Sequence, residues 1–242
     1  MTARQRAAWY APAPGSWRDW VSLLHPPYTA WHLGYVLIGA GLAPRLSVGR
    51  LVATLVAFGL AVGVGAHALD ELRGRPLGTS IPAPVLISVS AAAITGSVAL
   101  GGLGIARVGW GLAVFVAAGV VLVVGYNLEL WRFHNDVIFA LAWGSFPLLT
   151  AYFAQTGTLR LSAFAGAAFA FGLSKAQRTL STEARDMRRR VAEVSGEKRY
   201  LDGSNRALSL GSLLAPFEAC LLALSWSTCA LGVAMVLART GH

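Results

Sequence analysis

A short stretch near residue 70 places a histidine and two adjacent carboxylates beside two arginines. It follows a long apolar run and reads Gly65-Ala66-His67-Ala68-Leu69-Asp70-Glu71-Leu72-Arg73-Gly74-Arg75-Pro76. In a helix, His67, Asp70 and Glu71 have i,i+3 and i,i+4 spacing and therefore share one face. Carboxylates beside arginines suit a metal ion that holds a phosphate or diphosphate. The alternative is that both acids only pair with Arg73 and Arg75 at a solvated helix end.

A second group of charged residues follows a later apolar run. Its acids are Glu183 and Asp186, and its bases are Lys175, Arg178 and Arg185. Two carboxylate clusters on facing helix ends can hold metal ions that bridge a diphosphate, while Lys and Arg stabilise the leaving group. The alternative is a solvated basic helix whose arginines 188–190 bind anionic lipid head groups.

Two further groups are candidates for the wall of a cavity. Tyr126 and Asn127 end another apolar run, just before a polar loop that holds Glu129, His134 and Asp136. His32 lies between Trp31 and Tyr35, and a polar histidine among aromatic rings can line a cavity for a lipid substrate. The alternatives are a wet loop with an aromatic anchor and a belt of aromatic residues at the membrane interface.

The composition is that of a membrane protein. Of the 242 residues, 55% are hydrophobic and 13% are charged, whereas soluble domains carry about 25% charged residues. Several apolar runs approach the ~20 residues that cross a bilayer as a helix. We therefore predict an all-α, polytopic transmembrane helix bundle that forms one domain over residues 1–242. The two cysteines, Cys220 and Cys229, have no metal-type spacing and are expected to be small packing residues and not a disulfide.

The apolar runs predict seven spanning helices. Their expected ranges are 28–43, 50–69, 83–103, 107–127, 137–155, 160–178 and 213–237. The N-terminal segment 1–26 mixes aromatic and charged residues around 17–24, which predicts a short helix in the membrane interface. We see no cleaved signal peptide. The polar segment 179–212 is expected to be partly helical, with breaks at 195–196 and 202–205.

The charges predict the orientation of the bundle. With the N-terminus inside, 15 of the 20 Lys and Arg residues and all 11 acids lie on or near the inner face. The positive-inside rule therefore places the N-terminus and segment 179–212 in the cytoplasm, as in a multi-pass protein of a prokaryotic-type inner membrane. The net charge of +9 follows from this arrangement, and we do not expect binding to nucleic acid.

The order of these motifs resembles the UbiA-type intramembrane prenyltransferase superfamily. Residues 25–29 (His-Pro-Pro-Tyr-Thr) look like its opening Arg-Pro region, and residues 70–79 look like its first Asp-rich motif. Tyr126 and the segment Gly144-Ser145-Phe146-Pro147 are similar to its middle helices. Glu183 and Asp186 fall where its second Asp-rich motif is expected. The resemblance covers roughly residues 25–190, and the first motif is its most specific part.

This resemblance implies a helix bundle with a cavity open to lipid, in which Mg²⁺ and a prenyl diphosphate meet. The allylic cation formed there is captured by an acceptor, a lipid or an aromatic compound. On this reading Asp70 is the central aspartate of the first motif. Mg²⁺ is held by Asp70, Glu71, Glu183 and Asp186. The substrate is bound by His32, His67, Arg75, Lys175 and Arg178, and the catalytic residues are Asp70, Glu71, Tyr126 and Asn127.

The sequence also departs from the family pattern. Ala66 and His67 occupy the usual Asn-Asp pair, Gly74 replaces a final Asp, and seven spans are expected where nine are common. The alternatives are a terpene cyclase of the same type, a non-catalytic membrane protein that binds lipid or a partner, and a different metalloenzyme. The last would bind a transition metal through His67, Glu71, Glu129 and His134. The chain length, the acceptor and the oligomeric state stay open.

Overall fold

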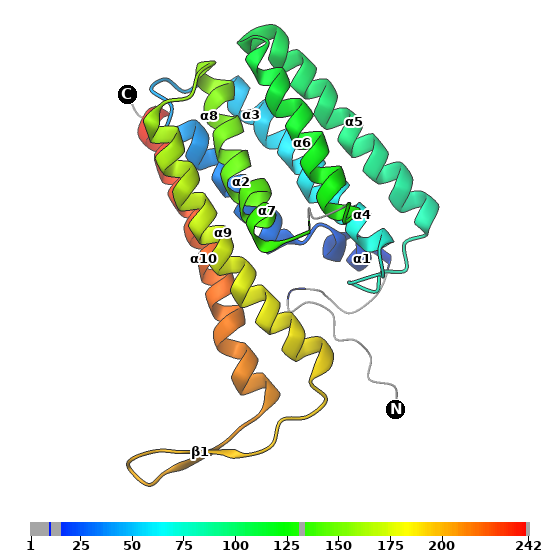
Figure 1. Cartoon of the computed structure of the whole chain (residues 1–242), viewed down its shortest axis with the longest axis vertical. Coiled ribbons are helices and arrows are strands. Elements are labelled where there is room, and N and C mark those ends of the chain that lie inside the picture. Colours follow the sequence, from blue (N-terminus) through cyan, green and yellow to red (C-terminus); the bar gives the residue numbers. More distant parts are fainter. Residues whose placement is uncertain (1–9, 11–15, 131–133, 241–242) are drawn as a thin grey trace.

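The apolar runs fold into antiparallel helices joined by short connections (Figure 1). The structure is a computed structural model, and it describes residue 10 and residues 16–130 and 134–240. Its helices are α1 (Ser16–Leu23), α2 (Pro26–Gly41), α3 (Val48–Phe58), α4 (His67–Leu72), α5 (Ala83–Val108), α6 (Gly111–Asn127), α7 (Asp136–Ala140), α8 (Phe146–Thr156), α9 (Leu161–Arg190) and α10 (Leu210–Thr240). The π-helical segments η1 (Gly59–Ala66) and η2 (Leu141–Ser145) join α3 to α4 and α7 to α8.

Four continuous helical stretches, some of which combine two of these helices with a π-helical segment, are long and apolar enough to cross a membrane. They are Val48–Leu72, Ala83–Val108, Asp136–Thr156 and Leu210–Thr240. Within the described residues, α2 with 16 residues and α6 with 17 are shorter, and α9 is charged over its second half. The all-α membrane fold is thus confirmed and every predicted span coincides with a helix. That all seven predicted spans cross the membrane stays a prediction.

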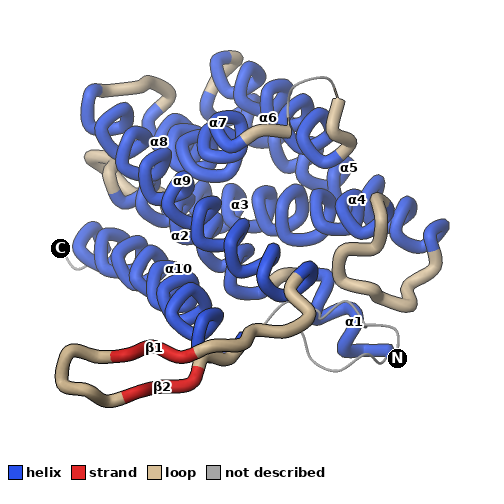
Figure 2. The backbone as a smooth tube through the Cα atoms, turned by 60° about the horizontal axis from the view of Figure 1, so that its bottom comes forward, coloured by secondary structure: helices blue, strands red, loops and turns tan. Residues whose placement is uncertain are grey.

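The connections gather at two ends of the bundle. Segments 73–82 and 191–209 and residues 128–130 and 134–135 lie at one end, which we call the polar end, and segments 42–47 and 157–160 lie at the other (Figure 1). Helices α9 and α10 extend beyond the bundle at the polar end. Between them the polar segment continues as helix to Arg190 and then forms an exposed hairpin of β1 (Glu197–Arg199) and β2 (Asn205–Ala207), visible in Figure 2. The predicted partial helix is therefore confirmed, and the hairpin adds to it.

Small residues let the central helices approach closely. A Cβ placed on Gly39 of α2 would lie 2.2 Å from the carbonyl oxygen of Leu148 in α8, and one on Gly232 of α10 would lie 2.6 Å from Cβ of Leu37. The core between these helices includes Trp31 and Tyr35, and the Trp31 indole donates to the Tyr35 hydroxyl at 2.7 Å. This tight packing holds α2 rigidly in the middle of the bundle.

Helix α1 is tied to the connection that follows α4. The buried carboxylate of Asp19 accepts a hydrogen bond from the Ser80 backbone at 2.9 Å, and Leu23 packs against Ala68 and Ile81. The predicted short N-terminal helix is present, and its location in a membrane interface stays a prediction.

Candidate functional site

A cavity of about 190 Å³ opens between α2, α4, α6, α7 and α9 at the polar end. Its lining is unusually rich in groups that bind anions. The polar lining residues are Tyr10, His25, Tyr28, His32, His67, Asp70, Tyr126, Asn127, His134, Gln177, Arg178, Ser181, Arg185, Arg188 and Arg189. Within the described residues, four arginines and one carboxylate line this cavity, and two of the arginines pair with acids outside its lining, Asp136 and Glu218. The two remaining arginines suit a phosphate or diphosphate.

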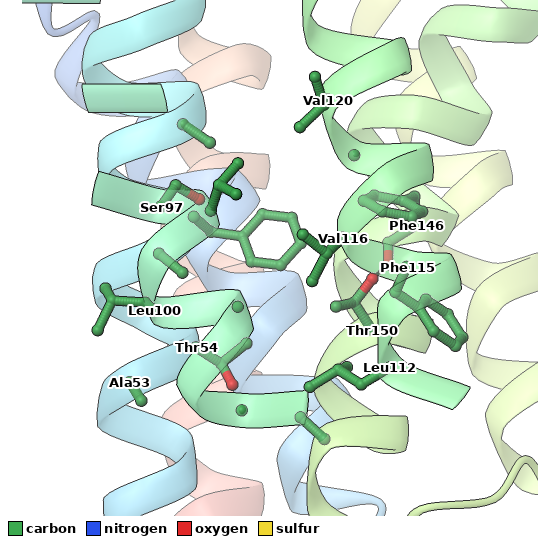
Figure 3. Close-up of a pocket in the computed structure, with 18 of the residues that line it drawn as sticks. Ala53, Thr54, Ser97, Leu100, Leu112, Phe115, Val116, Val120, Phe146 and Thr150 are labelled. Atoms are coloured by element: carbon green, nitrogen blue, oxygen red, sulfur yellow. Dashed lines mark hydrogen bonds between the residues drawn. The ribbon is translucent and has the colours of Figure 1, made fainter. Parts of the chain in front are cut away.

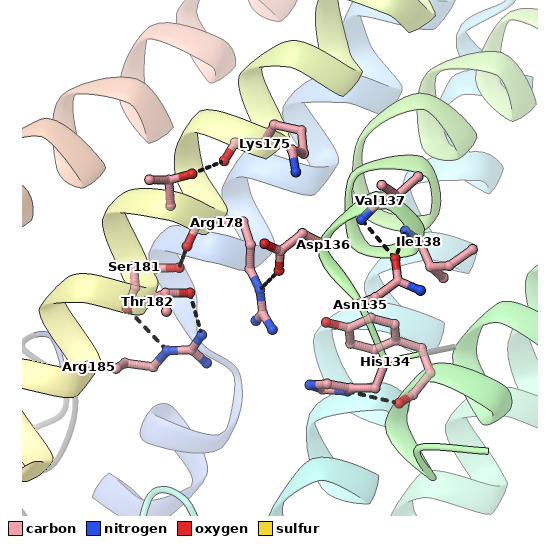
Figure 4. A network of polar contacts seen from close by, with 12 residues as sticks. His134, Asn135, Asp136, Val137, Ile138, Lys175, Arg178, Ser181, Thr182 and Arg185 are labelled. Atoms are coloured by element: carbon pink, nitrogen blue, oxygen red, sulfur yellow. Dashed lines mark hydrogen bonds and ion pairs between the residues drawn. The ribbon is translucent and has the colours of Figure 1, made fainter. Parts of the chain in front are cut away.

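Helix α9 supplies the positive charge. Gln177, Ser181, Arg185 and Arg188 follow one another at helical spacing and so share one face. Arg178 Nε donates to Asp136 at 3.1 Å, and the two are seen together in Figure 4. Arg188 Nε donates to Glu218 at 2.6 Å.

The other two arginines of the cavity contact uncharged groups. Arg185 donates to the Ser181 carbonyl at 3.2 Å, and Arg189 donates to the Pro76 carbonyl at 3.1 Å. Neither has a carboxylate partner within the described part of the chain. Their charges are therefore available to an anionic ligand.

Six of the predicted site residues meet in this cavity. They are His32, His67, Asp70, Tyr126, Asn127 and Arg178. The Asp70 carboxylate forms no hydrogen bond with any residue that the structure describes. Asn127 donates to the Val123 carbonyl at 2.6 Å, and His134 stacks on the Tyr126 ring with centroids 4.6 Å apart.

Glu71 and Arg75 do not line the cavity. The buried Glu71 carboxylate accepts from the Leu77 and Thr79 backbone at 3.0 and 2.8 Å and from the Thr79 hydroxyl at 2.9 Å. Arg75 donates to the Thr79 and Ile81 carbonyls at 3.3 and 2.6 Å. The helix ends at Leu72, and the connection folds back over it. In this structure both side chains therefore hold the 73–82 connection in place.

The predicted residues of α9 are divided between two faces. Arg178 lines the cavity, whereas Glu183 and Asp186 are exposed and Asp186 pairs with Arg190 at 3.1 Å. Lys175 is half-buried one turn before Arg178, as Figure 4 shows, but it does not line the cavity.

The four predicted Mg²⁺ ligands are consequently not assembled. No group of three or more His, Cys, Asp or Glu side chains that could hold a metal ion occurs among the described residues. Asp70 is the only one of the four that lines the cavity. Mg²⁺ often binds through one or two carboxylates together with substrate phosphates. Asp70 with a bound diphosphate fits this simpler arrangement, whereas a site made of four carboxylates does not fit.

His25 is a cavity residue that we did not predict as a site. It adopts left-handed backbone angles (φ 45°, ψ 57°) directly before Pro26, a strained conformation for a residue in this position. Its ring stacks on His67 with centroids 4.2 Å apart, and Nδ1 bonds to the Tyr10 hydroxyl. Burial, followed by the charge of His67, lowers the pKa of His25 well below its usual value.

The protons on this pair can be assigned. Burial raises the pKa of Tyr10, so its hydroxyl keeps the proton and donates it to Nδ1 of His25. The hydrogen of the neutral His25 ring then lies on Nε2, which is buried and has no partner in the described part of the chain. The Tyr126 hydroxyl is buried and unpartnered in the same way. Leaving such groups unpaired costs about 1–3 kcal/mol each, and both line the cavity, where a ligand or water can bond to them.

A larger apolar cavity of about 520 Å³ adjoins the polar one. Helices α3, α5, α6 and α8 line it with aliphatic and aromatic side chains, among them Phe58, Phe115 and Phe146. Figure 3 shows Ser97 and Leu100 of α5 opposite Phe115 and Val116 of α6. Val62 and Trp143 line both cavities. The arginine-lined cavity and the mainly apolar one therefore lie side by side and share part of their wall.

Comparisons with family models, with curated proteins and with solved structures give no match to this chain.

Proposed function

We propose that this protein is an intramembrane enzyme that ionises a prenyl diphosphate and passes the prenyl group to an acceptor. The observation that carries the proposal is that an arginine-lined cavity and a larger, mainly apolar cavity lie side by side and share Val62 and Trp143 in their walls. A prenyl diphosphate has a strongly anionic head and a wholly apolar tail. The arginine-lined cavity fits the head, and the chamber of about 520 Å³ fits the tail.

The cavity residues have distinct roles in this proposal. Arg178, Arg185 and Arg189 bind the diphosphate and neutralise the charge that grows on it as the C–O bond breaks. The unpartnered Tyr126 hydroxyl and His25 Nε2 supply further hydrogen bonds. Asp70, with the substrate's own phosphates, would hold Mg²⁺, which would add charge stabilisation to the leaving group. The aromatic rings of Tyr126 and Trp143 lie next to the reacting carbon and favour the cation.

We extend the proposal to the UbiA-type superfamily on the strength of the motif around Asp70, since Glu183 and Asp186 lie outside the cavity. The site retains the central Asp70 and replaces the remaining carboxylates with histidines and arginines of the cavity. We place the polar end in the cytoplasm, because most basic residues gather there. A cysteine at Ser204 in the hairpin should react with an impermeant thiol reagent only from the cytoplasmic side, in a protein lacking Cys220 and Cys229.

The test is release of pyrophosphate by the purified full-length protein. Geranyl, farnesyl and geranylgeranyl diphosphate are offered with Mg²⁺ or with EDTA. We expect release that needs Mg²⁺ and that Asp70→Asn lowers by about 10²-fold or more. Asp186→Asn, an exposed carboxylate on α9, is the matched control and keeps the wild-type rate. An Asp70→Asn protein that folds and retains its rate would remove Asp70 from the mechanism.

A non-catalytic protein that binds anionic lipid is the second candidate. The arginine-rich end of α9, with Arg189 and Arg190 exposed, favours it. Under this reading no prenyl diphosphate releases pyrophosphate. Charge reversal at residues 188–190 then abolishes binding to phosphatidylglycerol vesicles, while Asp70→Asn leaves this binding intact.

A further inference from the structure

We infer that His32 is the base that takes up the proton released when the allylic cation is quenched. This inference rests on the proposed function. His32 is 8% exposed in the middle of α2 and lines the polar cavity. Its ring lies 5.9 Å from that of Trp143, centroid to centroid. Trp143 lines both cavities, so His32 lies beside the wall that the two cavities share.

The backbone of η2 fixes the tautomer of His32. In an α-helix the carbonyl of Trp143 would accept a hydrogen bond from residue 147, but Pro147 has no N–H. Nδ1 of His32 lies 2.8 Å from this carbonyl oxygen. A carbonyl can only accept, so Nδ1 carries the hydrogen. In the neutral ring the lone pair is then on Nε2.

Nε2 of His32 is therefore a proton acceptor without a partner. No hydrogen bond to it occurs in the part of the chain that the structure describes. Two other histidines lie near it. Nδ1 of His67 also faces a backbone carbonyl, that of Gly63 at 3.2 Å, and its ring stacks on His25, while the neutral His25 presents an N–H. His32 differs from both in its position beside Trp143.

The position of His32 matches the place where a proton must leave. With the diphosphate among the arginines and the tail in the apolar chamber, the breaking C–O bond lies at the junction of the two cavities. The electron pair of this bond leaves with the diphosphate. When an acceptor X–H attacks the cation, an X–C bond forms, and the proton of X–H moves to His32 Nε2. Without an acceptor, a C–H bond beside the cation breaks, its electrons form a C=C bond, and Nε2 takes that proton.

Quenching without an acceptor makes this role measurable. The probe is geranylgeranyl diphosphate with Mg²⁺, and the full-length protein is used in detergent. Pyrophosphate release reports ionisation. The ratio of olefin to alcohol among the products reports proton loss against capture by water. We expect the wild type to form olefin, and His32→Asn to lower the ratio by about 10²-fold while pyrophosphate release continues. Asn keeps a donor near the position of Nδ1 and has no basic nitrogen.

Tyr35→Phe is the matched control. It removes a buried hydroxyl from the same helix, one that bonds to Trp31 and Ser174, and it does not touch the cavity. We expect it to leave the ratio of olefin to alcohol unchanged. If His32→Asn does not fold, His32→Gln is used. Carbethoxylation of wild-type His32 by diethyl pyrocarbonate, with and without geranylgeranyl thiolodiphosphate, gives a second measurement, in which the analogue should protect His32.

The outcomes separate the two proposals. A wild-type protein that releases no pyrophosphate from any prenyl diphosphate overturns the proposed function, and the inference on His32 with it. A wild type that releases pyrophosphate but forms only alcohol overturns the role of His32 alone. The role of His32 is also overturned if a folded His32→Asn or His32→Gln protein keeps the wild-type ratio of olefin to alcohol. It is overturned as well if the analogue inhibits pyrophosphate release without protecting His32 from carbethoxylation.

Discussion

Asp70 and Glu71 are neighbours in the chain, yet their carboxylates have different surroundings. Glu71 accepts three hydrogen bonds from Leu77 and Thr79, while Asp70 faces the cavity. We predict that Glu71→Gln lowers the free energy of unfolding by about 1.5–3 kcal/mol, because an amide cannot replace a charged acceptor of three donors. Thermal unfolding in detergent measures this loss. Glu183→Gln, at an exposed position of α9, should stay within about 0.5 kcal/mol of the wild type. Equal stability of the two variants would contradict this role of Glu71.

His25 makes the stability of the protein sensitive to acid. Because its pKa is lowered in the folded state, the unfolded chain binds more protons on this residue below about pH 6.5. Its contribution is complete above that pH and is lost as the pH falls, by at most about 1.4 kcal/mol per pH unit. We predict that His25→Asn, which tolerates left-handed backbone angles, loses less stability than the wild type between pH 7.5 and pH 5.5. Parallel pH profiles of the two proteins would refute this.

At the scale of elements, the helices were predictable and the functional site was predictable only in part. Apolar runs located every long helix, because burial of an apolar stretch in lipid allows little else. The end of α9 was the exception in its bounds, since the helix continues beyond the apolar run, from the expected 178 to Arg190. The helical spacing of His67, Asp70 and Glu71 could not show that the chain turns back after Leu72 and binds Glu71. The π-helical segments have no sequence signal except Pro147, whose missing N–H could have pointed to His32. Similarly, the spacing of Gln177, Ser181, Arg185 and Arg188 could have marked the inner face of α9.

The approach of α2 to α8 determines whether the bundle can form. A Cβ on Gly39 would overlap the backbone carbonyl of Leu148 at 2.2 Å, and backbone cannot move aside as a flexible side chain can. We predict that Gly39→Ala lowers the free energy of unfolding by about 1–3 kcal/mol. Gly172→Ala is the matched control, because nothing lies within 4 Å of the added Cβ. It should stabilise α9 by up to about 1 kcal/mol through helix propensity. Thermal unfolding of both variants measures these changes in stability. A Gly39→Ala protein as stable as Gly172→Ala would disprove the close contact between α2 and α8.

For the molecule as a whole, the proposed function depends on the separation of the arginine-rich cavity of α9 from the mainly apolar cavity. The arginines of α9 and the histidines of α2 and α4 lie at the polar end, and the chamber between α3, α5, α6 and α8 extends away from it. Only Val62 and Trp143, within the described residues, line both spaces. A ligand that occupies both must therefore carry its reactive bond at the boundary, so the length of its tail is limited by the apolar chamber and is independent of the head-group site.

This separation predicts that a substitution can change the preference for substrate tail length without affecting the head-group site. Ser97 of α5 lines the apolar chamber (Figure 3), whereas Ser88 of the same helix is exposed. Ser97→Phe fills part of the chamber and should lower kcat/KM for geranylgeranyl diphosphate relative to geranyl diphosphate by about tenfold, since overfilling a packed site costs about 1–3 kcal/mol. Ser88→Phe should leave this ratio unchanged. Pyrophosphate release with both substrates measures it. Because the head group is the same in the two substrates, an equal loss for both would mean that the tail lies outside the chamber.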